Sequence, residues 1–198
     1  SIGNNASVSH ENGIAIGQGS KITSGHSVAI GNDASAHYYS MAIGNAAKAT
    51  GSASCAVGGA AEAIADNTVA VGTSAKATGA DSIAIGKGAV VTGSNSIALG
   101  TGLTVGANNV ICLGDGTQNV GIGTTTPTEA LDVNGNIGLV GSGVKYIRGG
   151  SDVLTLESEY ALKIRSDWNN NNSSDPADII FYTGASERMR IKRETGNV

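Results

Sequence analysis

The chain has 198 residues, a formal net charge of -4 and 30 glycines, but one phenylalanine and one tryptophan. So few large aromatic side chains exclude an aromatic globular core, and the many small residues predict a thin, repeated core instead. The net negative charge gives no reason to expect nucleic-acid binding, which requires clustered Lys and Arg. No run of about 18 apolar residues is present and the N-terminus lacks a basic and apolar leader, so we expect no membrane insertion.

A four-residue motif recurs through the first half of the chain: two large apolar residues enclose a small one, and a glycine follows. The glycines are 14 residues apart, except for a step of 13 from Gly31 to Gly44. A fixed period of this length predicts a solenoid. The copies after the partial one at Ile2-Gly3 are Ile14-Ala15-Ile16-Gly17, Val28-Ala29-Ile30-Gly31, Met41-Ala42-Ile43-Gly44, Cys55-Ala56-Val57-Gly58, Val69-Ala70-Val71-Gly72, Ile83-Ala84-Ile85-Gly86, Ile97-Ala98-Leu99-Gly100 and Ile111-Cys112-Leu113-Gly114.

Each repeat is predicted to form two short strands and two turns. Between Gly72 and Gly86, the first strand is Ala75-Lys76-Ala77 and the second is Ile83-Ala84-Ile85. Side chains alternate between the two faces of a strand. We therefore expect the alanine pair to point inward with the lysine outward, and the two isoleucines of the second strand to fill the coil.

The small residue at the centre of the second strand is then expected to point out of the coil. A row of small residues permits close approach of a neighbouring chain, so we predict that this face packs around a symmetry axis with two other copies as a homotrimer. The predicted trimer-interface residues are Ala29, Ala42, Ala56, Ala70, Ala84, Ala98 and Cys112, with Ala15 in the equivalent position.

Cys55 and Cys112 lie four repeats apart. At the spacing of neighbouring strands they are separated by about 19 Å, which is beyond the span of a disulfide. We expect both to replace small apolar residues rather than to react.

The repeats resemble a known family. Ser82 to Gly86 and Ser96 to Gly100 carry Ser-Ile-Ala-(Ile/Leu)-Gly, each preceded by a Gly-x-x-Ser turn and an Ala-x-Ala or related strand. This pattern resembles the head repeats of YadA-like trimeric autotransporter adhesins over residues 1–114. The resemblance implies a left-handed parallel β-roll, three chains side by side, and a role in surface attachment. The shorter repeat, with His37-Tyr38-Tyr39-Ser40, departs from the pattern only in a loop.

Residues 115–143 break the period and form a predicted connector. Asn119 to Ile137, with Gly-Ile-Gly-Thr, Pro127 and Leu-Asp-Val-Asn-Gly-Asn, resembles a connector of phage tail fibres and viral spikes. In those proteins it often precedes an endosialidase-type self-cleaving chaperone, whereas bacterial adhesins of the first family continue into a stalk and a membrane anchor. We expect the natural chain to continue past Val198 or to have lost a chaperone.

Residues 144–198 are predicted to form a small antiparallel β-sandwich or prism, again trimeric. Tyr160, Leu162 and Ile164 alternate with polar residues, and 179–183 and 187–192 flank a glycine-marked turn at 184–186, which is typical of a hairpin. The predicted fold class is thus all-β throughout.

The polar loop at 167–176 is the first candidate recognition site. Trp168 beside Asn170, Asn171 and Asp175 would suit a sugar, because aromatic faces and amides bind glycans. The alternative is a tryptophan folded back onto its own sheet. Asp167, Asp175 and Asp178 would offer oxygen ligands to calcium, but their spacing matches no known metal loop and a solvated loop is expected. We predict no metal and no cofactor.

The turns of the first repeats supply the second candidate. His10, His26 and His37 fall in turns, and Tyr38 and Tyr39 are aromatic residues in a segment otherwise without them. They are candidates for a receptor patch, with surface decoration as the alternative. A third set would bind an acidic glycan or simply form a solvated strand face: Arg188, Arg190, Lys192 and Arg193.

Three function classes follow. The favoured one is a trimeric viral fibre or spike segment on the virion surface that presents loops to a host glycan or protein receptor. The second is a bacterial trimeric adhesin on the cell surface. The third is an enzyme such as a glycan-degrading tailspike, but no nucleophile with a base, phosphate loop or paired catalytic carboxylates is recognisable, so we expect no catalysis.

Overall fold

The computed structural model describes residues 1–137, 179–183 and 186–191. The described residues form strands and turns without a helix. By internal contacts the chain divides into two units, Ser1–Gly138 and Leu139–Val198. No helix in the described part is long and apolar enough to cross a membrane.

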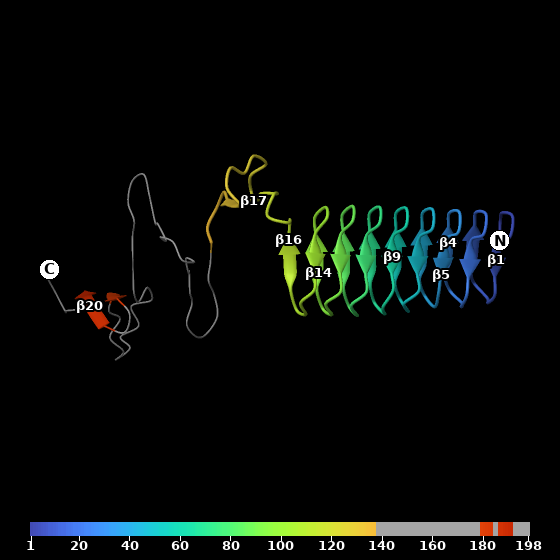
Figure 1. Cartoon of the computed structure of the whole chain (residues 1–198), viewed down its shortest axis with the longest axis horizontal. Helices are drawn as coiled ribbons and strands as arrows, with labels where there is room; N and C mark the ends of the chain where they lie inside the picture. Colours follow the sequence, from blue (N-terminus) through green and yellow to red (C-terminus); the bar gives the residue numbers. More distant parts are fainter. Residues whose placement is uncertain (138–178, 184–185, 192–198) are drawn as a thin grey trace. The chain divides into compact units, whose positions relative to one another are not determined.

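A parallel β-solenoid occupies most of the first unit, with its coils side by side (Figure 1). Two eight-stranded sheets, which we call sheet I and sheet II, form its walls. The strands of sheet I are β2 (Ile14–Ile16), β4 (Val28–Ile30), β6 (Met41–Ile43), β8 (Cys55–Val57), β10 (Val69–Val71), β12 (Ile83–Ile85), β14 (Ile97–Leu99) and β16 (Ile111–Leu113). Those of sheet II are β1 (Ser7–Val8), β3 (Lys21–Ile22), β5 (Ser35–Ala36), β7 (Lys48–Ala49), β9 (Glu62–Ala63), β11 (Lys76–Ala77), β13 (Val90–Val91) and β15 (Thr104–Val105).

The constant repeat length places equivalent residues of successive coils side by side. Ala70 pairs with Ala84 in sheet I, and Lys76 pairs with Glu62 in sheet II. All pairings within the two sheets are parallel and in register, across the 13-residue coil as well. The predicted two-strand coil and parallel solenoid are therefore confirmed.

Sheet II follows the predicted alternation. Ala75 and Ala77 are fully buried and Lys76 is exposed. The same pattern holds at Ala61 and Ala63. One wall of the core is therefore lined by alanine pairs.

Sheet I has the opposite orientation to the one predicted, so the predicted trimer-interface residues are wrong. The central alanines point into the coil, whereas the flanking residues point out, with Ile14 52% and Ile85 40% exposed. The interior between the sheets is narrow, and a single alanine facing an alanine pair fills it, so the larger side chains are excluded. Cys112 also packs against the core. The fully buried central residues are Ala15, Ala29, Ala42, Ala56, Ala70, Ala84 and Ala98.

A column of buried hydroxyls closes the interior at one turn. Thr68 Oγ1 donates to the carbonyl oxygen of Ala65 at 2.7 Å, and Ser54 Oγ donates to that of Gly51 at 2.7 Å. An unpartnered buried hydroxyl would cost about 1–3 kcal/mol. In the described part of the chain, every buried side-chain nitrogen and oxygen has a hydrogen-bond partner.

Glycine is required after the strands of sheet I from β2 to β12 because consecutive coils meet there backbone to backbone. Gly72 has φ +129°, and a Cβ at this position would lie 2.6 Å from the carbonyl oxygen of Gly86 in the next coil. Both the dihedral angle and the contact exclude a side chain.

A ladder of charges crosses the outer face of sheet II. Glu62 lies between two lysines, with carboxylate-to-Nζ distances of 3.4 Å to Lys48 and 2.8 Å to Lys76. The contact with Lys76 is the main cause of a lowered pKa at Glu62, and Lys48 adds to it. Because the side chains are partly exposed, the ladder contributes at most about 1 kcal/mol.

Among the described residues, two strand pairs lie outside the solenoid. In the first unit, β17 (Val120–Ile122) and β18 (Leu131–Val133) pair in parallel. In the second, β19 (Ile179–Thr183) and β20 (Ser186–Ile191) pair antiparallel, which confirms the predicted pairing, with the second strand shifted by one residue toward the N-terminus. The remaining residues of the predicted β-sandwich lie outside the described residues.

We expect Gly72→Ala to lower the free energy of unfolding by about 1–3 kcal/mol, because it forces alanine into a left-handed backbone and against a carbonyl. Gly59→Ala is the control, since a Cβ there has no atom within 4 Å. Urea denaturation followed by circular dichroism measures both. Equal stability of the two variants would contradict the close approach of the coils.

Glu62→Gln is expected to reduce stability by less than about 1 kcal/mol at pH 7. Because the folded-state pKa of Glu62 is lowered, its contribution is present above the unfolded-state pKa and is lost as pH falls through the folded value. Urea denaturation at several pH values should therefore show wild type and variant converging in acid. Glu129→Gln is the control, because Glu129 has no ion pair within the described residues.

Candidate functional site

The first coils depart from the repeat in the turns that lead from sheet II to sheet I. Later coils use small, acidic or amide residues there, such as Asp66-Asn67 and Ser94-Asn95. The early coils instead carry His10-Glu11, His26 and Tyr38-Tyr39. The scaffold does not need rings at these positions, so the departure marks a candidate site.

Backbone hydrogen bonds stack these early turns on one another. The N–H of His26 donates to the carbonyl oxygen of Glu11 at 3.3 Å, and the N–H of Tyr39 donates to that of Gly25 at 3.3 Å. Residues far apart in sequence are therefore held at the spacing of neighbouring coils.

The shortened coil keeps its turn through Ser40. Its Oγ accepts a hydrogen bond from the N–H of His37 at 2.7 Å and donates to the carbonyl oxygen of His37 at 2.8 Å. This clamp spans the tight turn, so Tyr38 and Tyr39 project from it with a defined direction.

The aromatic rings form one connected cluster. The rings of His26 and Tyr39 stack with centroids 4.8 Å apart and planes 6° apart, and Tyr38 meets Tyr39 edge to face at 4.4 Å. Such pairs contribute about 0.5–1.5 kcal/mol beyond burial. The nearby Tyr39 phenol raises the pKa of Tyr38, chiefly through repulsion between their charged forms.

Tyr39 is held in a backbone conformation that a bulky residue rarely adopts. The residue before each buried Ser or Thr is left-handed, with φ 59° at His26 and 52° at Tyr39. Asn67 and Asn95 hold the same place in later coils, and asparagine tolerates this conformation. Large rings at strained positions are typical of functional sites.

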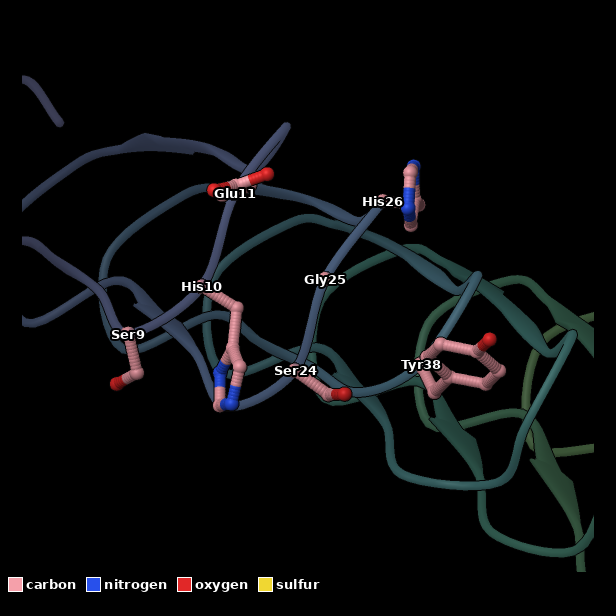
Figure 2. Close-up of a pocket in the computed structure, with 7 residues that line it drawn as sticks. All are labelled: Ser9, His10, Glu11, Ser24, Gly25, His26 and Tyr38. Atoms are coloured by element: carbon pink, nitrogen blue, oxygen red, sulfur yellow. The ribbon is translucent and has the colours of Figure 1, made fainter.

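A groove with a volume of about 480 Å³ lies over these turns. Figure 2 shows the side chains of Ser9, His10 and Ser24 in a row that ends at the ring of Tyr38, with Glu11 and His26 across the turns from that row. Two hydroxyls and an imidazole thus lie in a row that ends at an aromatic ring, and a carboxylate and a second imidazole flank the same groove. This arrangement can bind a ligand through hydrogen bonds and ring contacts.

Only some of the predicted site residues line the groove. Tyr38 lines the groove and contacts Tyr39 edge to face, while His10 and His26 line the groove and His37 does not. Sequence analysis missed Ser9, Glu11 and Ser24. Their only signal in the sequence is position: Ser9 and Glu11 flank His10, and Ser24 lies in the same turn as His26, one coil further along. Trp168, Asn170, Asn171 and Asp175 lie outside the described residues.

Among residues 1–137 and the two described C-terminal strands, no group of three His, Cys, Asp or Glu side chains is placed to hold a metal ion.

Tyr39→Asn is expected to leave the free energy of unfolding unchanged or to raise it by up to about 1 kcal/mol, because relief of backbone strain offsets the lost stacking. The matched variant Asn95→Tyr introduces the strain without the stacking partners and should lower it by about 1 kcal/mol. Thermal and urea denaturation measure both. A loss of more than about 1 kcal/mol in Tyr39→Asn would assign the ring to folding.

Comparison with known protein families supports the interpretation of the repeats. A family model described as the YadA head domain repeat (2 copies) matches residues 1–20, 38–61, 49–75, 63–89 and 77–102. All five segments lie within the solenoid. No curated protein matches the chain. Over residues 1–20 and 38–102 the solenoid is therefore similar to YadA head repeats.

Proposed function

We propose that the chain is part of a homotrimeric surface fibre that attaches to a host, with the solenoid as a stiff scaffold and the early turns as its recognition surface. The outer face of sheet I is the observation that supports this proposal most directly. The head-repeat matches support the same class of protein.

The outer face of sheet I is apolar along its whole length. Each of its eight strands presents two large apolar or sulfur-containing side chains, none of them buried, and Ile111 is 70% exposed. Contiguous exposed apolar surfaces of this extent mark interaction sites. The face consists of Ile14, Ile16, Val28, Ile30, Met41, Ile43, Cys55, Val57, Val69, Val71, Ile83, Ile85, Ile97, Leu99, Ile111 and Leu113.

Other copies of the same chain are the proposed occupants of this face. The alanine core buries little apolar surface per residue, at about 25 cal/mol per Å², so the solenoid gains substantially from covering sheet I. Partial burial raises the pKa of the Cys55 thiol, which keeps it neutral as an apolar interface requires. The proposed number of copies in the assembly, three, follows from the resemblance to trimeric adhesin heads.

We propose two alternative locations for the fibre, a virion and a bacterial cell surface. The connector at 115–143 resembles that of phage tail fibres and favours a virion, whereas the head-repeat matches favour a bacterial cell surface. The gene downstream of Val198 discriminates between them: a self-cleaving chaperone supports the virion, and a stalk with a membrane anchor supports the bacterial adhesin.

Binding without catalysis is also part of the proposal. Glu11 is the one carboxylate among the described residues lining the groove, and glycoside hydrolysis ordinarily needs two. The full chain should bind host cells without releasing soluble products. Release of oligosaccharides from host polysaccharide would overturn this.

Replacing Ile85 and Leu99 together by lysine is expected to convert a trimer into monomer or unfolded chain. Assembly would bury the lysine ammonium groups away from water without partners, which is costly. Val90→Lys on the outer face of sheet II is the control and should remain trimeric. Sedimentation velocity measures the assembly. A stable, folded wild-type monomer would contradict the trimer.

A further inference from the structure

We infer that the groove over the early turns binds a neutral sugar ring, as the terminal hexopyranose of a surface glycan. This inference rests on the proposed attachment function and names the chemistry that the fibre recognises. Ser9, His10, Glu11, Ser24, His26 and Tyr38 form the site.

The ring of Tyr38 supplies the apolar platform. It is 44% exposed, and its edge-to-face contact with Tyr39, which stacks on His26, fixes its orientation before any ligand arrives. A pyranose has an apolar C–H face that packs on an aromatic ring. A ring that is already held in place loses little entropy on binding.

Hydroxyl-bearing ligands match the polar lining. The hydroxyls of Ser9 and Ser24 each donate and accept, an imidazole does both through its two nitrogens, and the carboxylate of Glu11 accepts from two neighbouring hydroxyls. Adjacent hydroxyls on a sugar ring present this same alternation of donors and acceptors. A purely apolar ligand would leave these groups without partners.

The charge of the lining selects among sugars. A carboxylate lies in the groove and no lysine or arginine lines it. Sialic acid and sulfated glycans carry anions that normally require a guanidinium or ammonium partner. The groove therefore favours neutral hexoses over acidic ones.

Size distinguishes a sugar from a protein partner. A volume of about 480 Å³ falls in the range of small-molecule sites, which is roughly 300–1,000 Å³. A stable protein interface needs about 800 Å² on each partner. An open site for one or two sugar rings binds weakly, and three copies on one fibre would raise the avidity.

The test uses the full chain on an array of neutral, sialylated and sulfated glycans, followed by titration with the methyl glycoside of the best neutral hexose. Tyr38→Ala and Glu11→Gln should each weaken binding at least about tenfold. Tyr38→Phe, which keeps the ring, should bind more tightly than Tyr38→Ala. Asp66→Asn removes a carboxylate at the equivalent turn position of a later coil and should bind like wild type. Circular dichroism confirms that each variant is folded.

Several outcomes would overturn the inference: binding only to acidic glycans, no binding to any neutral glycan, or equal binding by wild type and Tyr38→Ala. Attachment to host cells is measured in parallel, with and without periodate oxidation of their glycans. Cells bound equally after oxidation would overturn the sugar site and leave the attachment function standing. Binding of the neutral hexose with no attachment to any host cell would support the site and overturn the proposed function.

Discussion

The narrow interior between the two sheets is the constraint on which the rest of the structure depends. Over most of the solenoid it accepts only alanine, serine and threonine. Where a larger side chain such as Val8 enters the interior, the residue facing it is smaller. Gly13 lies opposite Val8, and a Cβ on Gly13 would lie 2.6 Å from Cγ1 of Val8. Because large side chains are excluded from the interior, alternation along the strand turns Ile83 and Ile85 outward. The apolar surface that a globular protein would bury in its core is thus presented on a flat outer face, where another chain can cover it.

The same stacking creates the candidate site. Each coil places its turn beside the turn of the next coil, so three short departures from the repeat combine into one groove. The turns tolerate these departures because the walls, not the turns, hold the coil. Ser40 compensates for the missing residue of the short coil with hydrogen bonds to His37. The groove and the apolar face therefore lie on different surfaces: the early turns carry the groove, and sheet I carries the apolar face.

Sequence analysis correctly predicted the period, the two strands in each coil, the parallel register and the inward alanine pairs of sheet II, since these follow from spacing and alternation alone. It placed Ala84 outside and Ile83 inside because large apolar residues are usually buried. Alternation establishes only that the two residue types lie on opposite faces. It does not say which face is the interior. In the same way, Tyr38 was found as an unusual residue, but Glu11 and Ser24 became part of its site only through the stacking of three coils.

By itself, the sequence determined the repeat, the glycines that allow coils to meet, and the position of the aromatic turn. These are local properties, set by period and by backbone conformations such as that of Gly72. Only the tertiary structure decided which side of Ile83-Ala84-Ile85 faces inward and which turn residues form a groove. The physical reason is that both depend on the distance between the two sheets and on the register between coils, which arise when the whole solenoid packs.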